Sequence, residues 1–213
     1  MTITNGLITA AEYSAYTGAG VPSGLRSAQW ETAVEVASAW VEQHTGRQFH
    51  ETDTAASPTA SARYFDSVGD KVHITDCQSV TAVATDTGDD GTYSTTLAAT
   101  DYQLLPVGGY SDSLGSVPYT ALKQMSWMVW PRTVRERPVR VTGLWGWTAV
   151  PVVVKRACAI LTQDLMRDPE TNFGGLVANT DTGVVLGSRV PARTLTLLEP
   201  YVRVGRGSGL QVA

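Results

Sequence analysis

The sequence contains few of the residues on which catalytic and metal sites usually depend. Its 213 residues include two cysteines, Cys77 and Cys158, and three histidines. Neither cysteine has another cysteine or a histidine at metal-ligand spacing, so we expect neither a disulfide framework nor a zinc site. So few cysteines are typical of a chain that folds in a reducing cytosol. No cofactor and no metal is expected.

Charge is also scarce. Asp, Glu, Lys and Arg make up 17% of the chain, the formal net charge is -4, and the pI is near 5.3. A surface that grips a phosphate backbone needs clustered Lys and Arg, which this balance does not favour. The densest basic stretch, "WPRTVRERPVR", contains Arg132, Arg135, Arg137 and Arg140. Glu136 interrupts it, and we expect a solvated loop and strand face rather than a binding site.

Long apolar runs and signature motifs are missing as well. No stretch of 18 apolar residues occurs, and the start "MTITNGLITAAEY" lacks a basic segment before an apolar one, so neither secretion nor a membrane partner is expected. Nucleophile-elbow, Walker A and dinucleotide motifs are absent. We expect structural or surface positions for His44, His50 and His73. The chain is therefore predicted not to be an enzyme and to have no catalytic residues.

Helical patterns occur near both ends. Thr9 with Glu12 has the form of a capping box, which predicts a short helix ending near Gly18. A second helix of about five turns is expected after Ser23 or Ser27 as the cap, and Gly46 ends it. Its predicted apolar stripe comprises Trp30, Ala33, Val34, Ala37, Trp40, Val41 and His44.

The middle of the chain has β character. Short alternating runs such as "ARYFD", "KVHITD", "SVTAVATD" and "DYQLLP" are separated by turn chemistry, including "VGD" and "DC". Asp90-Gly91 lies where a hairpin turn is expected. The last β-type run, "RPVRVTGLWGW", ends in a pair of tryptophans that we call the Trp corner, Trp145 and Trp147.

Helical periodicity returns after the corner. Pro151 lies in the expected first turn of a helix whose apolar face comprises Val154, Ala157, Cys158, Leu161 and Leu165. A long Gly- and Thr-rich loop follows and is expected to be functional or mobile. A short helix around Leu195, Leu198 and Tyr201 comes last.

The fold class is therefore α+β. A helical body is expected from the N-terminal helices, the helix after the Trp corner and a C-terminal helix, with a β-rich insertion between them. The predicted parts are an N-terminal helical part at 1–50, the insertion at 51–147, a C-terminal helical part at 148–203 with a loop at 169–190, and a flexible tail at 204–213.

Six tryptophans are many for a chain of this size. Trp145 and Trp147 alternate by two, which predicts that they share a strand face, and Trp127 and Trp130 flank a loop. Large aromatic side chains fill cores but are also enriched at interface hot spots. We therefore consider Trp30 and Trp40 candidates for contacts between subunits.

The order of these parts resembles the head-tail connector adaptor family of tailed bacteriophages, also described as head completion or head-to-tail adaptor proteins. The likeness is carried by "LITAAEYSAYTG", "AVEVASAWVEQHTGRQF", "VRVTGLWGWTAVPVVVKRACAILTQDLMRDPE" and "TLTLLEPYVR". These stretches cover about half of the chain. The β-rich insertion matches only loosely and is larger than in the simplest, all-helical adaptors.

The resemblance implies a structural protein of the virion neck, made in the host cytoplasm. Such proteins form a homo-oligomeric ring, usually of twelve copies, beneath the portal protein of a filled capsid. The ring continues the DNA channel, through which the genome passes without sequence-specific binding. Its far face receives head-tail stopper or tail proteins. A lining poor in Lys and Arg would let the duplex slide.

Two hypotheses assign parts of the chain to this role. The first makes Trp145, Trp147 and Pro151 a structural joint that fixes the β insertion against the helical body. The second assigns the portal contact to the C-terminal helix and tail, as an apolar anchor with a polar rim. Its candidate residues are Leu198, Tyr201, Val202, Arg203, Val204 and Arg206.

One alternative from another class stays open at this point. The Tyr- and Trp-bearing insertion is also compatible with a β-rich protein- or carbohydrate-binding module without catalytic activity. That alternative predicts a monomer with an exposed aromatic groove.

Overall fold

The computed structural model describes residues 6–20, 22–49, 59–125, 130–131, 136–167, 177–179, 184–186 and 190–203. Helices and an antiparallel sheet are both present, so the predicted α+β class is confirmed. The chain divides into two compact units. The helical unit consists of residues 1–46 and 150–213, and the β unit consists of residues 47–149.

The helical unit begins with two helices that end at glycines. In α1, Ala10–Thr17, the Thr9 hydroxyl accepts from the Glu12 N–H while the Glu12 carboxylate accepts from the Thr9 N–H, which confirms the capping box. Gly18 ends α1 in the left-handed conformation. The long helix α2, Leu25–Thr45, ends at Gly46 in the same conformation, as predicted. Its N-cap is Gly24, so the expectation of Ser23 or Ser27 is wrong.

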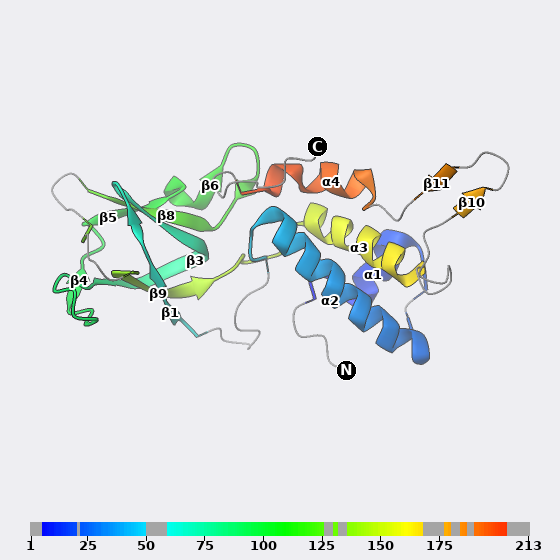
Figure 1. Ribbon diagram of the computed structural model, residues 1–213, viewed down its shortest axis with the longest axis horizontal. Coiled ribbons are helices and arrows are strands. Elements are labelled where there is room, and N and C mark those ends of the chain that lie inside the picture. Colours follow the sequence, from blue (N-terminus) through cyan, green and yellow to red (C-terminus); the bar gives the residue numbers. More distant parts are fainter. Residues whose placement is uncertain are drawn as a thin grey trace. The chain divides into compact units, whose positions relative to one another are not determined.

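The other helices of this unit pack around α3, Val152–Arg167, which contacts α1, α2 and α4, Ala192–Leu198 (Figure 1). Small residues line the buried faces of α2 and α3, including Ala37 and Ala157. The Ser38 hydroxyl accepts from the Leu7 N–H and lies 3.5 Å from the Cys158 sulfur. Small side chains of this kind allow two helices to approach closely.

The predicted helix stripes are largely confirmed. On α2, Trp30, Ala33, Val34, Ala37 and Val41 are buried. Trp40 is half-buried and His44 is exposed, so the stripe is narrower than expected. On α3 the predicted face is buried except for the half-buried Leu165.

The long connection after α3 contains strands β10, Val177–Asn179, and β11, Val184–Leu186, which pair antiparallel. The chain then continues through α4 into the 3-10 helix η3, Glu199–Tyr201. The Arg203 N–H donates to the Thr45 carbonyl at 2.8 Å, which ties the end of η3 to the end of α2.

The β unit is built around one seven-stranded antiparallel sheet. Its order is β1-β9-β3-β8-β5, and the short strands β2 and β4 also pair with β3. The bounds are β1, Ser61–Phe65; β2, Ser67–Val68; β3, Lys71–Thr85; β4, Thr95–Leu97; β5, Tyr102–Leu105; β8, Tyr119–Gln124; and β9, Val139–Trp145. A 3-10 turn η1, Val107–Gly109, precedes a small ribbon of β6, Tyr110–Ser111, and β7, Gly115–Ser116.

Strand β3 organises the sheet. Its first half pairs with β8 and its second half with β9, and the change of partner occurs around Cys77 with a break in register on each side. The expected turn at Asp76-Cys77 is therefore wrong, because this stretch is a bulged part of one 15-residue strand. The hairpin at Asp90-Gly91 is confirmed: it joins β3 to β4, and the Asp86 carboxylate accepts from both N–H groups of the dipeptide.

One face of the sheet forms an apolar core. Along β9 buried and half-buried residues alternate, which places Val139, Val141 and Trp145 inside. Trp130 joins this core and donates its indole N–H to the Asp70 carbonyl. The remaining buried members are Val72, Ile74, Cys77, Val83, Leu97 and Leu122.

Gly143 marks a close approach between β9 and β3. A Cβ at this position would overlap the Ser79 carbonyl oxygen and lie 3.2 Å from the Cys77 sulfur. We predict that Gly143→Ala lowers the free energy of unfolding by roughly 2–3 kcal/mol, because backbone of the neighbouring strand must move. Urea unfolding monitored by circular dichroism measures the loss. Gly20→Ala is the control, since nothing lies within 4 Å of its added methyl, and an equal loss in both variants would contradict the prediction.

The Lys155–Glu12 ion pair joins α3 to α1 at 2.6 Å. Partial burial opposes ionisation of Glu12, but hydrogen bonds from Lys155 and Thr9 and the Lys155 charge outweigh it and lower the pKa of the carboxyl. A carboxyl with a lowered folded-state pKa stabilises the fold above its unfolded pKa, and this contribution is lost as the pH falls through the folded value.

We therefore predict that Lys155→Met destabilises the protein at pH 7 by up to about 1 kcal/mol, as expected for a partly exposed pair. The difference from wild type should shrink at an acidic pH below the lowered folded-state pKa of Glu12, where the carboxyl is protonated. Urea unfolding at both pH values is the measurement. Lys123→Met is the control, because Lys123 lies 4.0 Å from Asp70 in an exposed pair. A difference that does not change with pH would refute the role of this charge.

Candidate functional site

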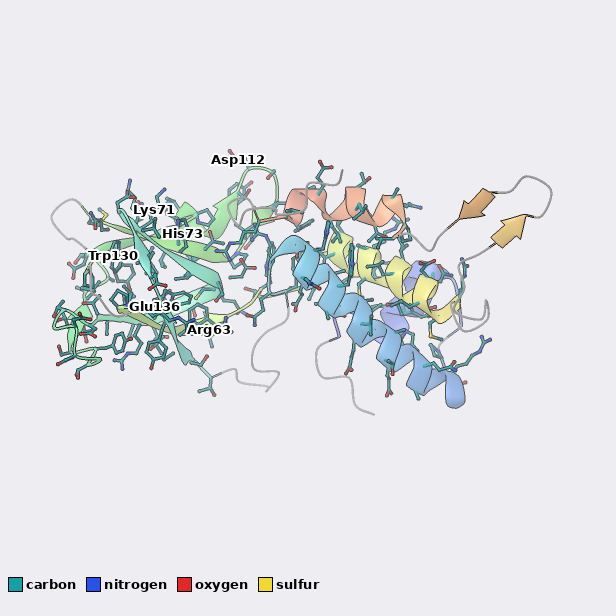
Figure 2. All side chains as sticks on the ribbon, in the orientation of Figure 1. Arg63, Lys71, His73, Asp112, Trp130 and Glu136 are labelled. Atoms are coloured by element: carbon teal, nitrogen blue, oxygen red, sulfur yellow. The ribbon has the colours of Figure 1, made fainter. Side chains whose placement is uncertain are left out.

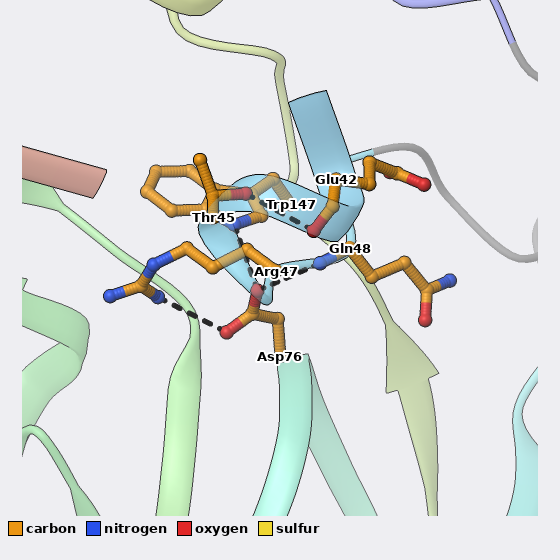
Figure 3. A network of polar contacts seen from close by, with 6 residues as sticks. All are labelled: Glu42, Thr45, Arg47, Gln48, Asp76 and Trp147. Atoms are coloured by element: carbon orange, nitrogen blue, oxygen red, sulfur yellow. Dashed lines mark hydrogen bonds and ion pairs between the residues drawn. The ribbon is translucent and has the colours of Figure 1, made fainter. Parts of the chain in front are cut away.

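The Asp76 carboxylate is fully buried where β3 changes partners. Its Oδ1 atom accepts from Nη1 of Arg47 at 3.2 Å. Its Oδ2 atom accepts from the Gln48 N–H at 3.1 Å and from the indole Nε1 of Trp147 at 3.3 Å (Figure 3). These donors satisfy a carboxylate that would otherwise be costly to bury.

The donors to Asp76 come from both ends of the β unit, and we call Asp76 with these donors the Asp76 cluster. Arg47 and Gln48 are the first two residues of the β unit, and Trp147 is close to its last residue, Ala149. The Asp76 carbonyl also accepts from the Gly146 N–H at 2.8 Å. One residue of the central strand thus holds the beginning and the end of the unit together.

Aromatic stacking encloses this cluster. The Trp147 ring lies 5.4 Å from the Phe49 ring, and the Arg47 guanidinium lies 5.7 Å from the Trp147 ring centre. Gln78 donates its side-chain amide to the Trp147 carbonyl. Trp147 is 5% exposed, so it is a buried anchor rather than a surface residue.

Trp145 has separate surroundings. It lies in the sheet core beside Phe65, donates its indole N–H to the Ser61 carbonyl at 3.0 Å, and is covered by the Arg63 guanidinium at 4.6 Å. Strand β9 ends at Trp145, and Gly146 follows with a φ of 94°. The prediction that the two tryptophans share a strand face is therefore wrong, because the chain turns between them.

The third predicted joint residue, Pro151, lies directly before α3. Its carbonyl accepts from the Lys155 N–H, so it contributes to the first turn of the helix in the helical unit. Sequence reasoning found the Trp corner but missed Asp76. The "DC" pair that contains Asp76 has the composition of a turn, so the sequence pattern favoured a turn there. The role of Asp76 follows only from the pairing of β3 with β8 and β9, which are distant in the sequence.

The candidate contact residues at the C-terminal end differ in burial. Leu198 is fully buried and Tyr201 is 8% exposed, so they cannot form the exposed anchor expected for them. Val202 is 38% exposed and Arg203 is half-buried. Val204 and Arg206 lie outside the described residues.

The candidate subunit-contact tryptophans also differ. Trp30 is 4% exposed and packs against Tyr13 at 6.0 Å. Trp40 is half-buried and stacks on His44, with ring centres 4.8 Å apart and an interplanar angle of 7°. Trp40 therefore keeps part of its surface exposed, whereas Trp30 exposes little, and the proposed role of both in subunit contacts stays a prediction.

The described residues give little sign of a catalytic or metal site. Among the residues that the structure describes, no group of three or more His, Cys, Asp or Glu could hold a metal ion. His73 lies exposed on β3 beside Lys71 (Figure 2), and His50 is outside the described residues. Burial raises the pKa of both thiols, Cys77 and Cys158, to about 11, which makes them poor nucleophiles.

The basic stretch at 130–140 is described in part. Arg132, Arg135 and Trp127 lie outside the described residues. Arg140 lies over the Tyr93 ring at 5.4 Å, and Tyr93 in turn packs against the exposed Tyr64 at 5.2 Å. No helix within the described ranges is long and apolar enough to cross a membrane.

We predict that Asp76→Asn destabilises the β unit by about 3 kcal/mol or more, because the replaced oxygen leaves a buried donor facing an amide N–H. Urea unfolding followed by tryptophan fluorescence checks this, since Trp147 reports on the cluster. Asp112→Asn, in the exposed loop between β6 and β7, is the matched control and should leave stability unchanged. Wild-type stability in the Asp76 variant would show that the carboxylate does not hold the unit together.

Similarity to known proteins is found in the fold. No protein-family model and no curated protein matches the chain. Among solved structures, a chain from the neck of a native gene transfer agent particle computed with C12 symmetry matches with a TM-score of 0.55 and 16% identity. A chain from the neck of an empty particle computed with C6 symmetry matches at 0.54 and 18%, and one from the native virion at 0.55 and 20%.

Each match covers 97% of this chain and 96% of the other, so both units take part. The resemblance to head-tail connector proteins is thereby confirmed at the level of the fold: this chain has the fold of a protein found in the neck of phage-like gene transfer agent particles.

Proposed function

We propose that this chain is a structural neck protein of a tailed phage or phage-like particle. In this role it forms a ring beneath the portal, extends the DNA channel and offers a docking face to stopper or tail proteins. The role is structural and requires no catalysis.

The fold likeness carries this proposal. It spans nearly the whole of both chains, and the matched particles' necks were computed with C12 and C6 symmetry. A chain of the same architecture that assembles in the same way would occupy a ring of twelve copies. Closed rings of this kind are built from head-to-tail contacts between identical subunits.

The charge of the chain agrees with a channel role. A duplex binds tightly where Lys and Arg neutralise its phosphates, because counterions are then released. A net charge of -4 over 213 residues does not favour such adhesion. A genome can pass such a subunit without being held.

The burial of the candidate side chains changes which residues we assign to the portal contact. Since Leu198 and Tyr201 are buried, the exposed apolar side chains at this end are Leu195, 39% exposed, and Val202, 38% exposed. We assign the contact to these two residues, to Arg203 and to the tail at 204–213. Leu198 and Tyr201 then support the contact from beneath.

The test is electron microscopy of the purified chain, alone and mixed with the portal protein encoded by the same genome. We expect rings, and a stacked complex with the portal.

Val202→Asp and a chain ending at Arg203 should weaken portal binding at least about tenfold while the protein stays folded, which is a loss of roughly 1.4 kcal/mol. Thr196→Asp, at an exposed position of α4, is the control. Absence of rings under both conditions would overturn the proposed function, and undiminished portal binding by both variants would overturn the docking surface.

One observation favours the alternative of a binding module. Tyr64 and Tyr93, with Arg140, form an aromatic and basic patch on the β unit, and Tyr64 is 45% exposed. Tyrosine and arginine are enriched at protein contact sites. A stable monomer that does not respond to the portal but binds a glycan or protein ligand through Tyr64 would support this alternative instead.

A further inference from the structure

The exposed face of α2 is unusual because it carries no charge from Gln29 to Gln43. Gln29, Thr32, Val36, Ala39 and Gln43 recur at spacings of three and four, so they form one stripe on the helix, and all are exposed. Val36 is 52% exposed. The solvent face of a helix in a soluble protein usually carries charged residues. A neutral stripe with valine and alanine at its centre loses little hydration when another surface covers it.

The two edges of this stripe differ from each other. Glu31, Glu35 and Glu42 follow one edge and are half-buried. The stacked pair Trp40 and His44 follows the other edge. The stripe therefore has an apolar centre, an aromatic side and an acidic side.

The face of α3 that is turned to solvent carries arginines, in contrast to the acidic edge of the α2 stripe. Val153, Arg156, Ile160, Gln163 and Arg167 recur with the same spacing. Arg156 and Arg167 are exposed and Val153 is 38% exposed, whereas Ile160 and Gln163 are half-buried. Lys155 lies on another side of the helix, where it binds Glu12, and Asp164 is at the edge of the stripe. This face combines apolar side chains with two arginines.

We propose that the α2 stripe of one copy packs against the α3 stripe of the next copy. An apolar centre with an acidic edge then meets an apolar centre with basic residues, which is the complementarity that selects a partner and its orientation. The two surfaces are different, so the contact is head-to-tail and can continue from copy to copy until a ring closes. The proposal rests on the neck function and names the faces that build the ring.

Cysteine cross-linking tests this contact. The native thiols of Cys77 and Cys158 are buried, with pKa values of about 11, so the introduced cysteines react selectively. The double variant Val36→Cys with Arg156→Cys is treated with a short bismaleimide in the ring, formed alone or with the portal. We expect a ladder of dimers, trimers and higher species on a denaturing gel.

Two controls define the geometry. An equal mixture of the two single variants should stop at dimers, because each chain then carries one reactive face. Val36→Cys with Ala15→Cys should give no ladder, since Ala15 is exposed on α1 and outside the α3 stripe.

The outcomes separate this inference from the function on which it rests. Rings without a ladder would overturn the inference and leave the neck function standing. Dimers from Val36→Cys alone would show a symmetric contact and also overturn it. Rings in which the thiol introduced by Val36→Cys stays accessible to a bulky maleimide would show that no neighbouring copy covers the α2 stripe, and this would overturn the inference too. If the wild-type chain forms no ring alone or with the portal, the proposed function itself fails.

Discussion

The β unit depends on one buried carboxylate. Asp76 is fully buried, and its oxygens are satisfied by donors from Arg47, Gln48 and Trp147. A buried charge is tolerated in this position because its donors are present. Removing one of these donors would lower the stability of the fold. The requirement for these donors fixes the beginning and the end of the unit against its central strand.

This arrangement binds the first and the last residues of the β unit to the same strand, β3. Residues 46–47 and 149–150, where the chain passes between the units, are next to segments that Asp76 holds. The ring contact of Trp147 with Phe49 and the burial of Trp145 in the sheet core add packing.

The helical unit achieves stability in a different way. Its helices begin and end at local signals, and small residues let α3 pack closely against its neighbours. The surface that this packing leaves exposed includes two helix stripes, an uncharged one on α2 and one with two arginines on α3. A folded monomer does not require a neutral face on α2, and the proposed contact between subunits uses this face for that reason.

The sequence by itself determined the helices, because a capping box, a glycine C-cap and a spacing of three and four residues are local properties. The sequence alone therefore predicts the capping box of Thr9 with Glu12, the end of α2 at Gly46, and most of the buried faces of α2 and α3. Tertiary structure decided how β3 is shared between β8 and β9, that Asp76 is a buried acceptor and not a turn residue, and that Leu198 and Tyr201 face inward. Each of these depends on segments far apart in the sequence, whose pairing carries no local signal and is settled when the buried polar groups and apolar faces are satisfied together.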